Sequence, residues 1–116
     1  MPQRIDKINE LLKRELGRVI LRDISLPKNI LVTISEVETT KDLREAKVFI
    51  SVFPDIEIKR VLNILGREVH NLRQDLNKRL SIRHLPKMRF LEDQELKEAQ
   101  RIEEVLRDSK IEENDS

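Results

Sequence analysis

The spacing of apolar residues predicts two long amphipathic helices. Between residues 4 and 23 they recur at three- and four-residue steps, as Ile5, Ile8, Leu12, Leu16 and Val19. This spacing keeps one helix face apolar. A second stripe has similar steps and is the strongest periodic signal: Ile58, Leu62, Leu65, Val69, Leu72, Leu76 and Leu80. A straight helix of this length would exceed about 30 Å, so we expect a break into two helices at Gly66 or Asn71.

Three shorter segments have the pattern of β-strands. Residues 29–38 are rich in β-branched side chains, and their apolar phase slips at Glu36–Val37, which predicts a bulge or a strand end. Residues 46–53 alternate with a period of two and are the expected hairpin partner. Residues 84–91 predict a third strand, with Met88 and Phe90 inward and Pro86 favouring an edge position. The expected fold class is α+β, in the order α-β-β-α-α-β with a three-stranded sheet and a C-terminal helical tail.

Charge divides the chain into a basic body and an acidic tail. Residues 1–90 hold 19 Lys and Arg against 12 Asp and Glu, a net charge of +7, and residues 91–116 hold 4 against 10, a net charge of −6. We expect one domain over residues 1–92 and an acidic tail over 93–116, with Asp93 as a helix cap and the last residues disordered. The tail helix would use Leu96, Ala99, Ile102 and Leu106. A basic body favours an anionic partner, and the tail either screens that body or is only a soluble helix end.

Composition removes several classes of function. The chain has 116 residues, no Cys, two His, two Gly and 39% charged residues. Without Cys there is no disulfide, thiolate metal site or cysteine nucleophile, and we expect a reducing compartment. There is no glycine-rich phosphate loop and no nucleophile or metal cluster around the histidines, so we expect no enzyme. Charges at the N-terminus and within residues 11–24 predict no secretory signal and no membrane span, hence a cytoplasmic or organelle-matrix protein.

Cationic side chains away from the two apolar stripes are the candidate RNA-binding residues. They are Lys7, Arg14 and Arg18 on the first helix, and Arg60, Arg67, His70, Arg73, Lys78 and Arg79 around the expected helix pair. Lys and Arg bind phosphates without reading sequence. With three Phe and no Trp or Tyr, we expect backbone and shape recognition of structured RNA. The alternatives are that each stripe is only a solvated helix face, and that Arg73 and Arg83 are structural.

A protein-interaction module is the alternative from a different class. It would use the acidic tail and the sheet face with Phe49 and Phe53 to bind a basic partner. The competing interpretation is that these two aromatic residues cover the sheet or pack under a helix. A basic helix at a membrane surface is disfavoured, because residues 4–23 contain no Trp or Phe.

Two segments of the chain resemble the ribosome-binding factor A family. They are Asp42-Leu43-x-x-Ala46-Lys47-Val48 and Arg83-x-x-Pro86-x-x-x-Phe90. The other matching residues are Leu26-Pro27, Val32-Thr33-Ile34, Val37-Glu38-Thr39, Leu72-Arg73, Leu76, Leu80-Ser81-Ile82, Lys87-Met88-Arg89 and Asp93. The resemblance covers about residues 4–93 and leaves out the tail.

The resemblance implies a type II KH-like domain in which an Ala-x-Gly kink replaces the Gly-x-x-Gly loop that normally clamps RNA. Counted back from Pro86, the kink falls on Glu68-Val69-His70, so this chain departs from the pattern at both small positions. A carboxylate at Glu68 would repel phosphate, whereas a protonated His70 would favour an anion. The alternative for His70 is an exposed polar residue on a helix.

The resemblance also implies a function. Proteins of this kind are non-enzymatic assembly factors that bind the immature bacterial 30S subunit, contact 16S rRNA near the neck and decoding region, and support rRNA processing. They leave the mature subunit with the help of a maturation GTPase. They need no cofactor, and we expect a monomer.

Overall fold

Three strands and two long helices make up most of the described chain. The computed structural model describes residues 2–80 and 84–99. The order is α1 (Pro2–Asp23), β1 (Leu31–Thr39), β2 (Glu45–Phe53), the 3-10 helix η1 (Asp55–Glu57), α2 (Ile58–Arg79) and β3 (Lys87–Glu92). Residues 94–99 are also helical. The predicted α+β class is confirmed.

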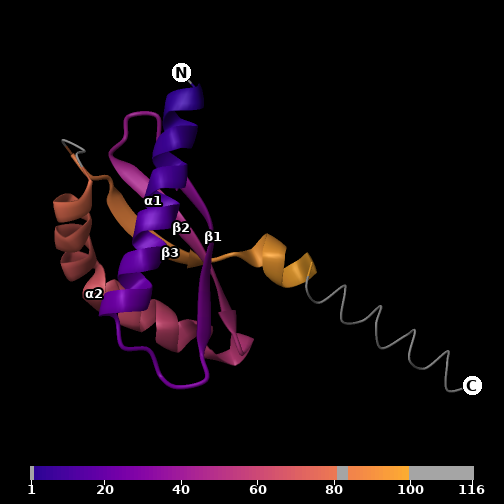
Figure 1. Cartoon of the computed structure of the whole chain (residues 1–116). Coiled ribbons are helices and arrows are strands. Elements are labelled where there is room, and N and C mark those ends of the chain that lie inside the picture. Colours follow the sequence, from indigo (N-terminus) through magenta and orange to yellow (C-terminus); the bar gives the residue numbers. More distant parts are fainter. Residues whose placement is uncertain (1, 81–83, 100–116) are drawn as a thin grey trace, which may run out of the picture.

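The sheet has the strand order β1-β2-β3, with β1 antiparallel and β3 parallel to β2. The predicted hairpin and the edge position of the third strand are therefore confirmed. β2 buries Ala46, Val48, Ile50 and Val52, and β3 buries Met88. Residues of α1 and α2 belong to the same buried cluster, and both helices lie against one face of the sheet (Figure 1). Neither α1 nor α2 covers the other face of the sheet (Figure 1).

β1 contains the predicted bulge. Its register with β2 shifts between Ile34 and Glu36, which leaves Ser35 without a partner in the ladder. The expected position, Glu36–Val37, was one residue too far along the chain. An extra residue reverses the alternation of faces, and Val37 is consequently only 4% exposed.

α1 is fixed to the sheet by its apolar stripe and by two hydrogen bonds to the side chain of Asn9. Leu12, Leu16 and Val19 are at most 1% exposed. Asn9 Oδ1 accepts hydrogen bonds from the Thr39 backbone N–H, at 3.0 Å, and from Thr39 Oγ1, at 2.5 Å. The helix ends at Asp23, where the predicted stripe also ends, and Pro27 follows four residues later. These contacts set the direction in which the cationic residues of α1 point.

α2 is one continuous helix, so the predicted break at Gly66 or Asn71 is wrong. Its ribbon instead changes direction near the middle (Figure 1). Its buried residues come from both halves: Val61, Leu65, Leu72 and Leu76. A bend keeps both halves on the core without giving up the helical hydrogen bonds. Glu68 and His70 lie within this helix, and His70 is exposed, which matches its alternative interpretation as a polar helix residue.

The tail begins with the expected cap. Asp93 Oδ1 accepts a hydrogen bond from the Leu96 backbone N–H at 3.0 Å, and the Asp93 carbonyl accepts one from the Lys97 N–H at 3.2 Å. Three predictions fall outside the described residues. They concern Arg83, the tail positions Ile102 and Leu106, and the disorder of the last residues. Among the described residues, no helix combines the length and the apolar character needed to cross a membrane.

Candidate nucleic-acid interface

Three arginines converge on one buried carboxylate, Glu15, which is 8% exposed. Its Oε1 accepts a hydrogen bond from Arg18 Nη1 at 3.2 Å and lies 3.4 Å from Arg14 Nε. Its Oε2 lies 3.7 Å from Arg79 Nη1, at the end of α2. We call Arg14, Arg18 and Arg79 the arginine cluster. Its three positive charges outnumber the one carboxylate, and the side chains of Arg14 and Arg18 are each 62% exposed, so the cluster presents net positive charge to solvent.

A second set of basic residues lies along the exposed side of α2. Arg67, His70 and Lys78 are all exposed, and a helical rotation of about 100° per residue places all three on one side of the helix. His70 Nε2 lies 3.2 Å from Gln74 Nε2. Among residues 2–80 and 84–99, neither Arg67 nor Lys78 has a carboxylate oxygen within 4 Å. We call Arg67, His70 and Lys78 the α2 outer face.

Arg60 lies about two helical turns before Arg67 and is partly neutralised. Its Nη1 is 3.7 Å from Glu57 Oε2, three residues earlier. Such exposed pairs contribute little to stability. The Arg60 side chain is still 62% exposed, so it extends the positive surface towards the start of α2 with reduced net charge.

Arg73 has a structural role, which was the alternative interpretation of this residue. Its guanidinium donates hydrogen bonds to the carbonyl oxygens of Leu85, at 3.2 Å, and Pro86. These carbonyls belong to the segment that leads into β3. Two of the five N–H donors of Arg73 hold this segment against α2, so Arg73 supports the fold and is not among the phosphate contacts proposed below.

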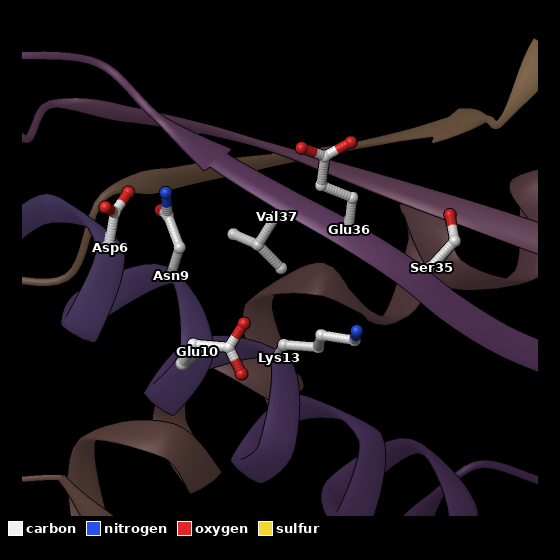
Figure 2. A pocket seen from close by; sticks show the side chains of 7 residues that line it. All are labelled: Asp6, Asn9, Glu10, Lys13, Ser35, Glu36 and Val37. Carbon is white, nitrogen blue, oxygen red and sulfur yellow. The ribbon is translucent and has the colours of Figure 1, made fainter. Parts of the chain in front are cut away.

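Lys7 lies next to one member of the arginine cluster, Arg14, but also next to two carboxylates. It lines a shallow hollow together with Asp6, Glu10, Leu11 and Arg14. The adjoining cavity of about 200 Å³ lies between α1 and the bulge of β1 and is lined by Asp6, Asn9, Glu10, Lys13, Ser35, Glu36 and Val37 (Figure 2). Three carboxylates against one ammonium make this region repel phosphate. It therefore bounds the positive surface on the N-terminal side.

Two carboxylates interrupt the positive surface where α1 and α2 end. The pKa of Asp75 is raised, first by a hydrogen bond with Asp23, then by desolvation and by the charge of Asp23, while Lys78 and Arg22 oppose the shift. Arg22 Nε lies 3.6 Å from Asp23 Oδ1. The cations at this end are thus interspersed with acids, and the net positive charge is concentrated in the arginine cluster and the α2 outer face.

Glu15 is the residue that reasoning from the sequence missed. Its position in the sequence could have identified it. Glu15 is a charged residue directly before Leu16 on the buried side of α1, and Arg14 and Arg18 lie one residue before it and three residues after it. Buried charges need partners, and this one has three. Within the described ranges 2–80 and 84–99, no group of three or more His, Asp or Glu is arranged to hold a metal ion.

The bent second helix, the mixed sheet and the cationic helices define a small α+β domain of the type II KH-like class. A family model described as "Ribosome-binding factor A" matches residues 4–106. The chain belongs to the ribosome-binding factor A family. The match runs beyond residue 93, where the resemblance was expected to end, and into the acidic tail.

Relatives and solved structures agree with this assignment. The chain is 35% identical to ribosome-binding factor A of Halothermothrix orenii over 96% of this chain and 92% of that protein, and 36% identical to that of Desulforamulus reducens over 91% and 89%. The crystal structure of ribosome-binding factor A from Thermus thermophilus has a TM-score of 0.67 at 28% identity, covering 76% and 93%. A homology model of the Thermus thermophilus factor, fitted into the cryo-EM map of a 30S complex, has a TM-score of 0.63 at 30% identity, covering 72% and 88%.

Proposed function

We propose that this chain binds the immature 30S subunit and its 16S rRNA and assists subunit maturation and rRNA processing, by binding and not by catalysis. Family membership over residues 4–106 supports this function, as does the Thermus thermophilus relative placed in a 30S complex. On this proposal, residues 1–92 are the RNA-binding domain and 93–116 an acidic tail. The protein works as a monomer in the cytoplasm without a cofactor, and a maturation GTPase helps to release it.

The arginine cluster is the observation that supports RNA contact most directly. A carboxylate held between α1 and α2 orients three guanidinium groups, and planar guanidinium groups match phosphate geometry. The α2 outer face supplies two further cations, Arg67 and Lys78, which have no carboxylate oxygen within 4 Å in the described chain. We propose that both sets contact rRNA phosphates and that Lys7, Arg60 and His70 add weaker contacts.

Salt dependence of binding tests this surface. Each phosphate contact contributes roughly 0.7–0.9 to the slope of log affinity against log salt. Reversing Arg67→Glu and Lys78→Glu, singly and together, is expected to weaken binding to immature 30S subunits and to flatten the slope stepwise. Co-sedimentation over a series of salt concentrations measures both quantities.

Lys28→Glu is the matched control, because Lys28 is exposed in the loop between α1 and β1 and the charge change is the same. It is expected to leave the slope unchanged. Equal effects from Lys28→Glu and Arg67→Glu would mean that only net charge matters. Unchanged binding in the double variant would show that the α2 outer face is the wrong surface.

An exposed apolar patch supports protein interaction as a second candidate function. Phe53 is 72% exposed and its cross-strand partner Leu31 is 65% exposed, so Phe53 does not pack under a helix, whereas Phe49 is half-buried. We propose a protein contact here if Phe53→Thr lowers co-sedimentation while the salt slope stays at the wild-type value. An unchanged affinity would exclude this patch.

A further inference from the structure

A groove with cations of its own lies on the sheet, where β2 and β3 begin. A hollow of about 280 Å³ lies between the starts of β2 and β3 and is lined by Glu45, Ala46, Lys47, Lys87, Met88 and Arg89. Lys47, Lys87 and Arg89 are all exposed, and Glu45 is the single carboxylate in the lining. We call Lys47, Lys87 and Arg89 the sheet cations.

The pairing of the strands forces two like charges together. Lys47 on β2 and Arg89 on β3 are direct partners in the parallel ladder, so their backbones lie about 4.8 Å apart. Like charges placed opposite each other destabilise a sheet. Glu38 is the partner of Lys47 on β1. Even so, in the described part of the chain no carboxylate oxygen lies within 4 Å of either cation.

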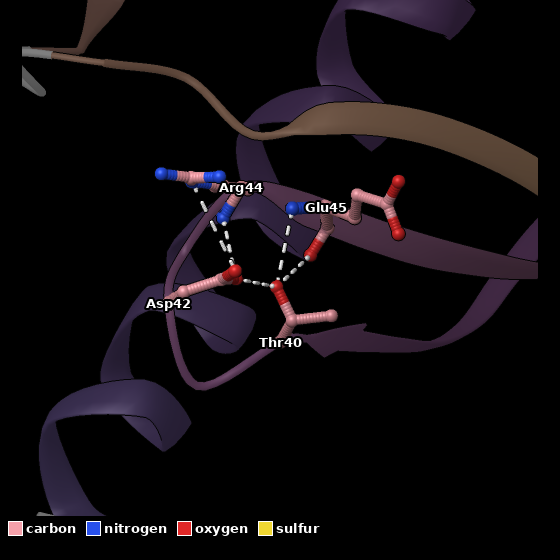
Figure 3. Close-up of polar contacts among 4 residues, drawn as sticks. All are labelled: Thr40, Asp42, Arg44 and Glu45. Atoms are coloured by element: carbon pink, nitrogen blue, oxygen red, sulfur yellow. Dashed lines mark hydrogen bonds and ion pairs between the residues drawn. The ribbon is translucent and has the colours of Figure 1, made fainter.

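The groove is held in a fixed shape by the turn before β2. Thr40 Oγ1 donates to Asp42 Oδ1 at 2.6 Å and accepts from the Glu45 N–H at 3.2 Å, while the Arg44 N–H donates to Asp42 Oδ1 at 3.1 Å (Figure 3). The Arg44 carbonyl then accepts a hydrogen bond from the Lys87 N–H at 2.8 Å. The turn thereby sets where β3 begins, and with it the opposition of Lys47 and Arg89.

We propose that the sheet cations bind the ribose-phosphate backbone of a second RNA segment, on the face opposite the helices. Two like charges that face each other, with no carboxylate oxygen within 4 Å among residues 2–80 and 84–99, break a local rule of stability, which is a sign of a functional site. A phosphate between Lys47 and Arg89 supplies the close negative charge that Glu38 does not. Successive side chains of a strand point to opposite faces. Because Ala46 and Met88 are in the core with the helices, Lys47 and Arg89 lie on the other side.

RNA fits this groove better than an acidic protein segment does. Protein interfaces have an apolar centre, but the exposed large apolar residues of the described chain, Leu21, Leu31, Phe53 and Ile56, do not line the groove. Phosphate contacts need only cations at the surface. With cations on both faces, the domain would hold two separate rRNA segments together, which deepens the proposed function and rests on it.

Site-directed crosslinking distinguishes the outcomes. The chain has no cysteine, so Lys47→Cys, Arg67→Cys and Lys28→Cys each provide a single attachment point for a photoreactive group on the full chain. With immature 30S subunits, position 47 and position 67 are expected to label different rRNA segments, and position 28 neither. The proposal is wrong if position 47 labels ribosomal protein, the chain's own tail or nothing, or the same rRNA segment as position 67. If wild-type protein does not co-sediment with the subunits at all, the proposed function itself is wrong.

Arg89→Glu gives a readout that a purely structural role would not produce. It replaces a like-charge pair by an opposite-charge pair, so the midpoint of urea unfolding is expected to rise. Affinity for immature subunits is expected to fall, with the salt slope flattened by roughly 0.7–0.9 for one lost contact. Lys28→Glu, with the same change in charge, should alter neither. A more stable variant that binds with unchanged affinity and slope would overturn the proposal.

Discussion

The guanidinium of Arg79 lies 3.7 Å from the carboxylate of Glu15, so the last turn of α2 is tied to the middle of α1. The Arg79 side chain is 28% exposed, about half as much as those of Arg14 and Arg18. Arg79 is therefore the member of the arginine cluster that contributes most to packing. Glu15 has a structural and an electrostatic role together: it joins the helices and keeps three like charges close.

Glu15→Gln separates these roles. The substitution keeps the shape of the side chain and removes the charge that offsets the arginine cluster. Because two of the three arginines, Arg14 and Arg18, are largely solvated and screened, we expect a loss of about 1–2 kcal/mol in the free energy of unfolding. Urea denaturation measures it, and the loss should shrink at high salt. Glu10→Gln, on the same helix but exposed, is the control, and an equal effect of both variants would contradict the role given to Glu15.

The Asp23 and Asp75 pair predicts a stability that depends on pH. The pKa of Asp75 is raised above its ordinary value of 3.8, mainly through Asp23. A raised pKa in the folded state means that this contribution to stability is full below pH 3.8 and is lost as pH rises through the folded pKa. Asp75→Asn should therefore be more stable than wild type at about pH 7, with the difference vanishing towards about pH 3.

Thermal unfolding between these pH values measures this effect. Asp23→Asn is expected to give a similar gain, and the double variant less than the sum of the two, because either change removes the same repulsion. Additive gains would mean that the two carboxyl groups do not interact.

Local alternation in the sequence was sufficient to predict the sheet. The period of two in β2 identifies its buried face without any tertiary information, and the phase slip in β1 locates the bulge to within one residue of Ser35. The residues of the α2 outer face were predicted to be exposed for the same reason, since helical periodicity decides which side chains face away from an apolar stripe.

Contacts between distant segments were not predictable in this way. The partners of Arg73 are carbonyls 12 and 13 residues away, and Glu15 meets Arg79 only once both helices have packed. The opposition of Lys47 and Arg89 depends on a parallel pairing between strands separated by a whole helix. No periodicity along the chain encodes these registers, so helix-wheel reasoning placed Arg73 among the phosphate contacts and did not include the sheet cations.

Asp93 is expected to stabilise the fold near neutral pH and not in acid. Its pKa is lowered from 3.8, first by the Ser35 hydroxyl and then by the Leu96 N–H, and Ser35 Oγ lies 2.5 Å from Asp93 Oδ2. A lowered pKa gives stability that is present above pH 3.8 and lost as pH falls through the folded value. Asp93→Ala should cost about 1 kcal/mol near neutral pH through loss of the helix cap. Asp93→Asn retains a good cap and should cost less, and equal losses in urea denaturation would contradict the capping role.

Gly66→Ala tests directly whether α2 is continuous. A Cβ built on Gly66 meets nothing within 4 Å, and the residue lies inside an uninterrupted helix without a positive φ. In a helix interior, alanine is more favourable than glycine by roughly 0.5–1 kcal/mol, so the variant should be more stable by about that amount in urea denaturation. Gly17→Ala, at an equally open position in α1, should give a similar gain and serves as the reference. If the helix were instead broken at Gly66, as the sequence pattern alone predicts, alanine would destabilise the protein at position 66 while still stabilising it at position 17.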